Sequence, residues 1–267
     1  MLSRWARVAH PARALELARC FTAFRAPSAF ARAYLRLGAP AYPHRLRDRA
    51  GWVDVELRDW HDAATAWVVF CRREYRVPPD ARCIVDLGAN FGAFSLYAAS
   101  VAPSARVLSI EPHPEQFPRL AANVGRERLM GRVTACNFGV AASAGERWMD
   151  ADPEHPAPSR GIHPVRETAP PSSVRVQTLT LPEILDRARA ETGAARIDLV
   201  KMDVEGAEHE IIPQLRAGVL DAVDAWAMEY HPNGPKAPLF AALERAGLRL
   251  VHDRQTHPDS GVAHFAR

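Results

Sequence analysis

The sequence predicts an α/β protein with a doubly wound, mainly parallel sheet. Short runs of β-forming residues alternate along the chain with segments whose apolar residues recur at helical spacing. One stretch, residues 84–92, joins such a strand to a helix through a glycine-containing turn. A chain of 267 residues with 48% hydrophobic and 24% charged residues has the size and composition of a globular protein with a full core.

The composition also argues against several classes of protein. Lys201 and Lys236 are the only lysines, so the net charge of +3 reflects an arginine-rich composition, and we expect no nucleic-acid partner. No apolar run is long enough for a membrane span, and the N-terminal arginines are not followed by the apolar core and cleavage site of a signal peptide. Four scattered cysteines, none in a C-x-x-C pair, are typical of reduced core residues in a cytoplasmic protein: Cys20, Cys71, Cys83 and Cys136.

Residues 1–50 form the first predicted region, a basic helical extension. Ten arginines against Glu16 and Asp48 give it a formal charge of +8. Apolar residues at helical spacing, punctuated by Pro11 and Pro27, predict two or three short amphipathic helices. We favour a cap packed on the main domain. The alternative is a docking surface for an acidic partner, a membrane or a second subunit, which would make a homodimer through these helices.

Residues 51–267 form the second predicted domain. Its strands are expected at 52–57, 84–87, 106–111, 132–140, 174–179, 197–204 and 223–230, with a closing hairpin of 248–252 and 261–265. Its helices are expected at 63–75, 91–101, 114–124, 182–190, 207–216 and 238–246. Residues 150–173 contain six prolines and no hydrophobic periodicity, so we expect a loop that is mobile without substrate and acts as a lid.

The glycine turn follows the pattern D-x-G-x-N-x-G, formed by Asp86, Gly88, Asn90 and Gly92. Asn90 stands where the dinucleotide fingerprint G-x-G-x-x-G has its second glycine. The glycines allow a sharp turn and the close approach of a ligand, at which the turn would aim its N–H groups. The carboxylate of Asp86 would repel a pyrophosphate, whereas it suits the sulfonium and ammonium groups of S-adenosylmethionine (SAM). Glu111 ends the next strand 23 residues after Gly88, close to the spacing at which an acid binds ribose hydroxyls.

A second group of polar residues lies in the segment 201–208. Lys201 and Asp203 interrupt an otherwise apolar strand, and burying such charges costs several kcal/mol unless they are paired. We favour a functional role over a structural one for Asp203. For Glu205, which follows in this segment, the sequence does not decide between a functional and a structural role. The position of Glu208 is explained by the favourable field at the N-terminus of the next helix.

Glu229 and His231 end the following strand, where the same crevice should continue. His231 precedes Pro232, so a simple loop histidine and a catalytic one explain it equally well.

Four segments in this order resemble the FkbM family of SAM-dependent methyltransferases. They are IVDLGANFG (84–92), IEPHPEQFPRLAANV (110–124), IDLVKMDVEGAE (197–208) and MEYHP (228–232), and the resemblance runs from about residue 51 to 250. It implies a class I methyltransferase fold, a Rossmann-like sheet of seven strands with the last antiparallel. It also implies O-methylation of a hydroxyl on a small molecule such as a natural product or sugar. One departure is Pro182, which stands where the family usually has an acid, so any role of that acid is in doubt here.

The resemblance also implies roles for individual residues. The residues of the glycine turn would line the SAM site, and Glu111 would hold the ribose. Asp203 and Glu205 would face the reacting centre. The full predicted cofactor-binding set is Asp86, Gly88, Ala89, Asn90, Gly92, Glu111, Pro112, Asn137 and Asp203. The predicted catalytic set is Lys201, Asp203, Glu205 and His231.

The hydroxyl must lose a proton, and the sequence leaves two ways open. Asp203, Glu229 and His231 could hold a divalent metal such as Mg²⁺. Alternatively His231, with an ordinary pKa of about 6.5, could act as the base while Asp203 orients it. We favour the metal-free version because no tight spacing such as H-x-x-x-H occurs in the chain. If His231 proved dispensable, Lys201, Glu205 or His113 would take the role.

Two other functions compete with methyl transfer. A methyltransferase-like scaffold could bind SAM or a partner without transferring a methyl group. An NAD-dependent oxidoreductase is a weaker third, since Asn90 disfavours the dinucleotide fingerprint.

Overall fold

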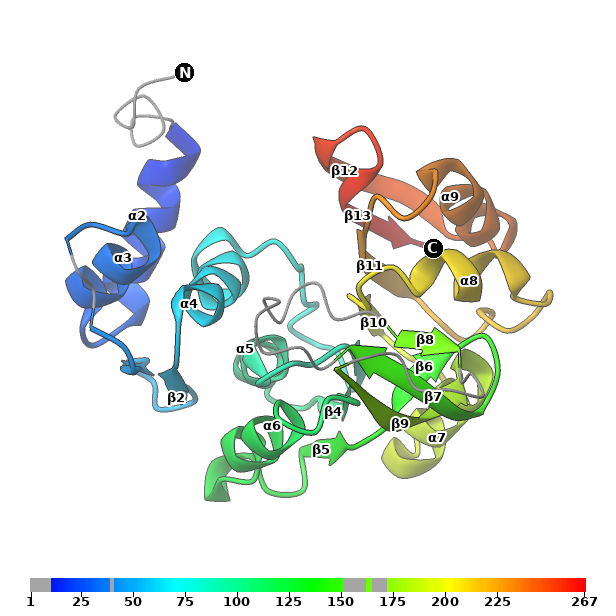
Figure 1. Cartoon of the computed structure of the whole chain (residues 1–267), viewed down its shortest axis with the longest axis horizontal. Coiled ribbons are helices and arrows are strands. Elements are labelled where there is room, and N and C mark those ends of the chain that lie inside the picture. The colour runs from blue at the N-terminus through cyan, green and yellow to red at the C-terminus, as the bar shows by residue number, and fades with distance from the viewer. Residues whose placement is uncertain (1–10, 39–40, 151–161, 165–171) are drawn as a thin grey trace. The chain divides into compact units, whose positions relative to one another are not determined.

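The computed structural model describes residues 11–38, 41–150, 162–164 and 172–267 (Figure 1). The chain divides into two compact units, Met1–Tyr75 and Arg76–Arg267. Each unit has its own buried aliphatic and aromatic residues.

The first unit combines helices with a short hairpin. Its elements are α2 (Pro11–Ala23), α3 (Pro27–Leu35), β1 (His44–Arg47), β2 (Asp54–Leu57), α4 (Trp60–Ala66) and the π-helical η1 (Trp67–Arg72). Pro11 and Pro27 each begin a helix, where their fixed φ and missing N–H are tolerated. The rings of Tyr34 and Trp67 stack with centroids 4.4 Å apart, and Phe24 and Phe30 are buried beside them. The predicted amphipathic helices are therefore present among the described residues, and aromatic packing holds them.

The boundary of this unit differs from the predicted one at residue 50. β2 pairs with β1 in antiparallel register, from His44 opposite Leu57 to Arg47 opposite Asp54. The indole Nε1 of Trp67 donates to Glu16 on α2 over 2.6 Å. Residues 51–75 are thus held by the N-terminal helices. Hydrophobic periodicity cannot show this, because the pairing joins segments far apart in the chain.

The second unit is built on a seven-stranded sheet in the order β12-β13-β11-β10-β3-β4-β5. The strands are β3 (Cys83–Leu87), β4 (Arg106–Ile110), β5 (Val133–Cys136), β10 (Leu199–Met202), β11 (Ala225–Tyr230), β12 (Arg249–His257) and β13 (Ser260–Ala266). β13 runs antiparallel to both of its neighbours, whereas the pairs from β11 to β5 are parallel. The predicted doubly wound sheet, its closing hairpin and its antiparallel last strand are confirmed.

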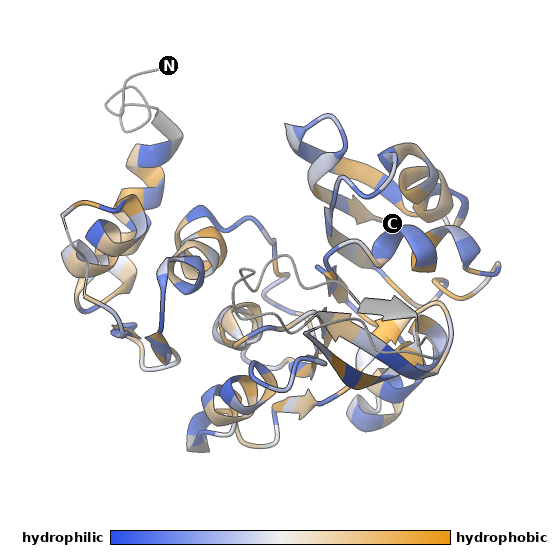
Figure 2. Cartoon of the chain, viewed as in Figure 1, coloured by the Kyte–Doolittle hydropathy of each residue, from blue (hydrophilic) through white to orange (hydrophobic). Residues whose placement is uncertain are grey.

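Helices cover both faces of this sheet. α5 (Ala93–Val101) and α6 (Phe117–Val124) lie together in Figure 1, away from α8 (Glu208–Ile211) and α9 (Lys236–Arg245). α7 (Leu181–Thr192) packs with α8 and α9 over the main core, to which β3 contributes Cys83, Val85 and Leu87. Figure 2 shows hydrophobic residues along the strands and mixed colours on the surrounding helices. None of the helices in the described residues has the length and apolarity needed to cross a membrane.

A second sheet of four strands was not expected. It has the order β6-β9-β7-β8, formed by β6 (Gly139–Ala141), β7 (Gly145–Asp150), β8 (Ile162–Pro164) and β9 (Ser173–Thr180). The single strand predicted at 132–140 is wrong, since it divides into β5 of the main sheet and β6 of this one. The division falls at Asn137, whose side-chain amide donates to backbone carbonyls after β4.

The loop predicted at 150–173 lies largely outside the described residues. Its described part includes β8, whose Ile162 pairs with Met149 of β7. The lid function and the mobility of this segment stay predictions.

The departure from the family pattern at Pro182 has a local explanation. Thr180 is the N-cap of α7, and it forms a capping box with Glu183 in which each side chain binds the other residue's backbone N–H. Pro182 occupies the first turn of this helix, where a missing N–H costs nothing.

The turn between β3 and α5 depends on two glycines with positive φ. Gly88 has φ +75°, and a Cβ at this position would lie 1.8 Å from the carbonyl oxygen of Asp203. Gly92 has φ +92°, and its Cβ would lie 2.9 Å from Cδ1 of Leu120 on α6. The space beside these two glycines, where a side chain would lie, is therefore occupied by Asp203 and Leu120.

Replacing Gly88 by alanine should destabilise the protein far more than the same change at Gly193. Both residues have positive φ, +75° and +69°, so both variants lose about 1–2 kcal/mol to backbone strain. A Cβ at position 193 would have no atom within 4 Å, whereas a Cβ at position 88 would clash with a backbone carbonyl. The Gly88→Ala protein should therefore lose about 1–3 kcal/mol more of its free energy of unfolding. Urea denaturation of the two variants measures the difference. Equal losses would show that the contact with Asp203 does not constrain the turn.

Candidate functional site

The N–H groups of the glycine turn are already bonded within the protein. The amides of Gly88 and Ala89 donate to the last carbonyl of β4, over 3.1 and 2.9 Å. The Asn90 amide donates to a carboxylate oxygen of Glu111 over 2.7 Å, and that of Gly92 donates to the Ala89 carbonyl over 2.8 Å. The expectation that these four N–H groups point at a ligand is wrong. A pyrophosphate would find no free N–H among them, which independently disfavours a dinucleotide.

Glu111 is buried at the end of β4, with 6% of its surface exposed. One oxygen accepts the Asn90 amide and the other accepts the His113 amide, over 2.7 and 2.8 Å. Burial raises the pKa of Glu111 to about 7, although both amides act in the opposite direction. Each oxygen keeps a lone pair for a further donor, so the carboxylate can still accept hydroxyl groups. Asn137 donates to the carbonyls of Glu111 and Pro112 over 3.0 and 3.3 Å, which holds this segment in place.

Asp86 is fully buried and its carboxylate is engaged by the protein itself. One oxygen accepts the hydroxyl of Ser95 over 2.6 Å, and Ser95 also contacts the hydroxyl of Ser109 over 2.7 Å. The other oxygen lies 3.3 Å from Nζ of Lys201. Burial raises the pKa of Asp86, and the charge of Lys201 opposes this shift. The partner of Asp86 in the structure is therefore an internal lysine.

Lys201 is a buried ammonium at the centre of this part of the molecule, with 3% of its surface exposed. Its Nζ donates to the Gly88 carbonyl over 2.8 Å and lies 3.6 Å from Oδ2 of Asp203. Burial alone would lower the pKa of Lys201, but Asp86 and Asp203 raise it by more. Lys201 therefore remains charged and joins the glycine turn to the end of β10.

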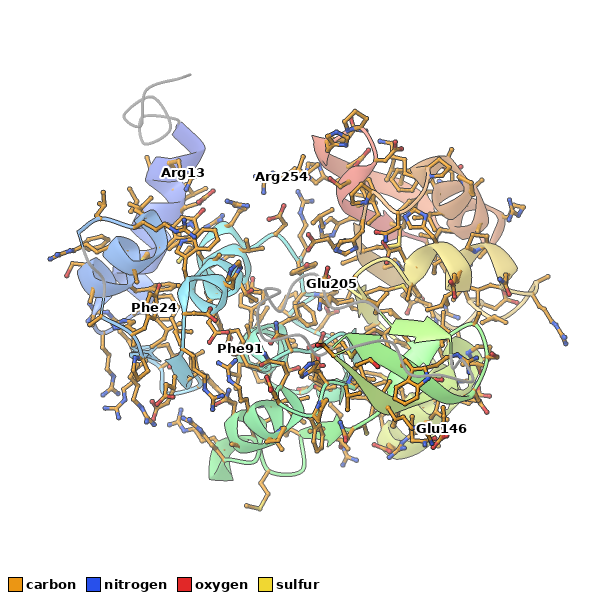
Figure 3. The ribbon with its side chains drawn as sticks, in the orientation of Figure 1. Arg13, Phe24, Phe91, Glu146, Glu205 and Arg254 are labelled. Atoms are coloured by element: carbon orange, nitrogen blue, oxygen red, sulfur yellow. The ribbon has the colours of Figure 1, made fainter. Side chains whose placement is uncertain are left out.

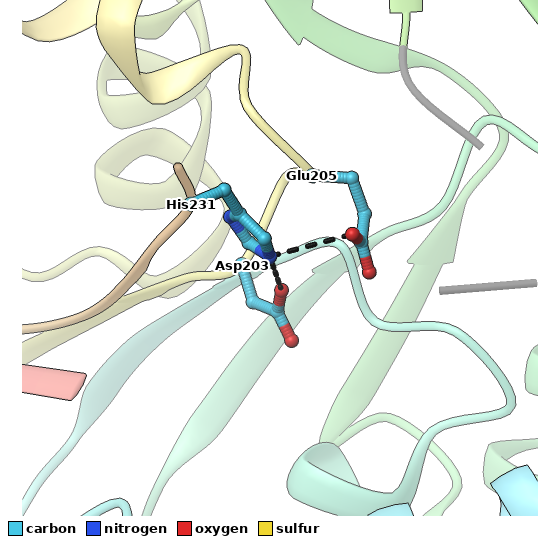
Figure 4. Close-up of side chains that lie close together, drawn as sticks. All are labelled: Asp203, Glu205 and His231. Carbon is cyan, nitrogen blue, oxygen red and sulfur yellow. Dashed lines mark ion pairs between the residues drawn. The ribbon is translucent and has the colours of Figure 1, made fainter. Parts of the chain in front are cut away.

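Asp203, Glu205 and His231 meet beyond the ends of β10 and β11 (Figure 4). Nε2 of His231 lies 3.3 Å from Glu205 and 3.9 Å from Asp203. Glu205 has a positive φ of 53°, and Figure 3 shows it near the carboxyl end of β10. The three side chains are 16–28% exposed, so a ligand can reach them.

A fourth residue, Glu208, controls the charge of this group and was missed as a functional residue. It is fully buried and accepts both the backbone N–H and Nδ1–H of His231, over 2.8 and 3.0 Å. A sequence signal existed, since Ile211 and Ile212 stand three and four residues later and place Glu208 on the buried side of a helix. Burial alone would lower the pKa of His231, but Glu208 and Asp203 raise it to about 10.

These charges change the expected chemistry of the group. His231 is an imidazolium at neutral pH, so the ordinary pKa on which its role as the base depended does not hold. Burial and the charge of Asp203 raise the pKa of Glu205 to about 9, although the charge of His231 acts in the opposite direction.

The metal ligands predicted from the sequence need a correction. Among the described residues, the donors that lie within 4.8 Å of one another belong to Asp203, Glu205 and His231. Glu229 is not in this group, because it lies within β11 and Glu205 approaches from the turn after β10.

The fold and the site together define a class of protein. The sheet order, the single antiparallel strand, the glycine turn after β3 and the acid after β4 are those of a class I methyltransferase. Residues 86–249, more than half of the chain, match the methyltransferase FkbM domain. The chain belongs to this family of methyltransferases, and the resemblance seen in the sequence is confirmed.

Several known proteins are similar to the chain. Methyltransferase sdnD of Sordaria araneosa is 29% identical over 199 residues, covering 66% of this chain and 77% of that protein. The 31-O-demethyl-FK506 methyltransferase FkbM of Streptomyces tacrolimicus is 33% identical over 199 residues, covering 64% of this chain and 74% of that protein. The solved structure of Methyltransferase FkbM from Methylobacillus flagellatus KT has 15% identity and a TM-score of 0.45, covering 74% of this chain and 47% of that chain.

Replacing Lys201 by methionine should destabilise the protein by about 3–5 kcal/mol, because it leaves the buried Asp86 without its counter-charge. The double variant Lys201→Met, Asp86→Asn should recover part of this loss, since no unpaired charge is then buried. Urea denaturation of the two variants and of Asp86→Asn measures the coupling. A Lys201→Met protein within about 1 kcal/mol of wild type would show that the buried pair does not hold the turn.

Proposed function

We propose that this methyltransferase uses SAM to methylate a hydroxyl group of a small molecule. The observation that carries the proposal is the direct contact between the glycine turn and the acid–histidine group. The carbonyl of Asp203 fills the space beside Gly88, so a donor held at the turn and an acceptor held at Asp203 would be neighbours. The name of one similar protein, a 31-O-demethyl-FK506 methyltransferase, supports an oxygen atom as the acceptor.

The residues after β3 and β4 fit the adenosine part of SAM. Glu111 offers two carboxylate oxygens, each already oriented by one backbone amide and each able to accept one more hydrogen bond. A ribose presents two neighbouring hydroxyl donors that match this arrangement. The bonded amides of the turn suit a donor that brings no phosphate group to them.

The acid–histidine group fits the acceptor. Bound SAM would supply an activated methyl group on a sulfonium, so the chain must hold the alcohol, exclude water and remove a proton. His231 would donate from Nε2 to the alcohol oxygen and stabilise the negative charge that develops there. Asp203, between Lys201 and His231, would accept the hydroxyl proton.

A metal-assisted version of proton removal uses the same three residues. Asp203, Glu205 and His231 offer two carboxylates and one imidazole, a donor set suited to Mg²⁺ or Mn²⁺. A bound cation would have to displace the proton of His231 and act against the raised pKa of Glu205. We favour the metal-free version for this reason.

Calorimetry should show that the protein binds SAM and S-adenosylhomocysteine. The Glu111→Gln variant should bind SAM about tenfold more weakly or worse, because charged hydrogen bonds are worth about 1.5–3 kcal/mol each. Hydroxyl donors favour the ionised carboxylate, whose pKa is about 7 in the free protein. The affinity of the wild type should therefore rise between about pH 6 and pH 8, and that of Glu111→Gln should not.

The exposed Glu115→Gln is the matched control, with the same chemical change in the same segment. Binding of NAD without SAM or its product would reject the proposed cofactor. Equal SAM affinity in the wild type and Glu111→Gln would remove Glu111 from the ribose site.

Replacing His231 by alanine should lower the rate at which an alcohol acceptor is methylated by about 10²-fold or more. This is the usual scale for loss of a proton-transfer or charge-stabilising group. SAM affinity should stay within about twofold, because His231 lies beyond β11 and the predicted ribose contact lies after β4. EDTA should leave wild-type turnover unchanged. Loss of turnover on chelation with recovery on Mg²⁺ would instead establish the metal-assisted version, and full activity of His231→Ala would reject both.

A further inference from the structure

We infer that Glu208 is a positioning residue, which holds the His231 ring by Nδ1 so that Nε2 faces the acceptor. This inference rests on the proposed function, because it assigns Glu208 a task in the same reaction. Glu208 acts through His231 and need not touch the acceptor or the cofactor.

The first argument is that every oxygen of Glu208 binds the two segments that carry the acid–histidine group. Oε1 accepts the backbone N–H of His231 and its Nδ1–H, over 2.8 and 3.0 Å. Oε2 accepts the amide of Gly206 over 2.9 Å, next to Glu205. One buried carboxylate therefore fixes both the ring and the turn that bring Glu205 and His231 to 3.3 Å.

The second argument concerns the direction of the ring. A ring nitrogen that donates to a carboxylate is fixed as a donor, and the opposite nitrogen is left to face the site. Figure 4 shows one ring nitrogen of His231 directed at Asp203 and Glu205 and the other directed away from them. A buried carboxylate in contact with this second nitrogen sets the direction of the first.

The third argument is that a helix N-terminus does not explain the burial of Glu208. α8 has only four residues, so its dipole stabilises an acid at its N-terminus only slightly. A carboxylate with 0% exposure costs several kcal/mol unless it is paired, and the partner that His231 provides lies on a different strand end. A second contact locks the same segments, since Nε2 of His209 lies 2.8 Å from the His231 carbonyl.

The test compares Glu208→Gln with Glu210→Gln, the same change at an exposed residue of the same helix. Glu208→Gln should lower kcat by about 10- to 100-fold, which is the usual effect of losing a group that orients a functional histidine. The acceptor KM and the SAM affinity should change by less than about threefold. In the His231→Ala background, Glu208→Gln should lower kcat by less than about twofold more, because its effect passes through His231. Glu210→Gln should behave as wild type.

A spectroscopic measurement on the wild type tests the hydrogen bond between Glu208 and His231 and does not depend on whether Glu208→Gln folds. In protein labelled with ¹⁵N-histidine, the His231 signals are those missing from His231→Ala, and Nδ1 should carry a proton protected from exchange with water. Glu208→Gln should lower that protection, because a neutral amide oxygen is a weaker acceptor than a carboxylate. An exchanging or absent Nδ1 proton in the wild type would overturn the inference, as would additive losses of kcat in the two backgrounds. These spectra need no acceptor, so a protein that methylates no alcohol would reject the proposed function without deciding the role of Glu208.

Discussion

The site depends on one buried ammonium, that of Lys201. Strands in the middle of a parallel sheet are covered on both faces and are usually apolar, so a lysine there must be fully compensated. Asp86 provides the opposite charge from the adjacent strand, where it pairs with Lys201 in register, and the Gly88 carbonyl accepts a hydrogen bond. Asp203 lies 3.6 Å away on the side of His231. Because a buried charge cannot be left without these partners, Lys201 ties the glycine turn to the residues after β10.

The glycine turn makes the same connection by close packing. Gly88 has no Cβ, so the carbonyl of Asp203 can approach the turn to a distance that any other residue would block. An ion pair and a steric contact thus fix the same two segments against each other. Neither needs a bound ligand, which means that the chain holds the turn and the acid–histidine group together before it binds cofactor or acceptor. Such preorganisation is what positions reacting groups at low cost.

The sequence contains the local part of this arrangement. The alternation of strands and helices, the glycines of the turn and the positions of Glu111 and Asp203 all follow from periodicity and spacing. The partner of Asp86 does not, because Lys201 lies 115 residues later and only the register of β3 with β10 brings it near. The bonded amides of the turn depend in the same way on β4. The departure of β6 into a second sheet depends on β9, and the role of Glu208 depends on the loop after β11. Prediction failed where a side chain or amide finds its partner in a distant strand.

The charges around His231 fit the proposed O-methylation, which releases a proton. Transfer of a methyl group from a sulfonium to an alcohol leaves two neutral products and one proton, which the site must accept. His231, with its pKa raised to about 10, holds a proton already, and the raised pKa of Glu205 favours the protonated form of that carboxyl. Glu208 is committed to His231 by two hydrogen bonds. Asp203 is left as the carboxylate that faces the site, flanked by the charges of Lys201 and His231. The position of Asp203 between these two cations supports the proposal that Asp203 accepts the proton.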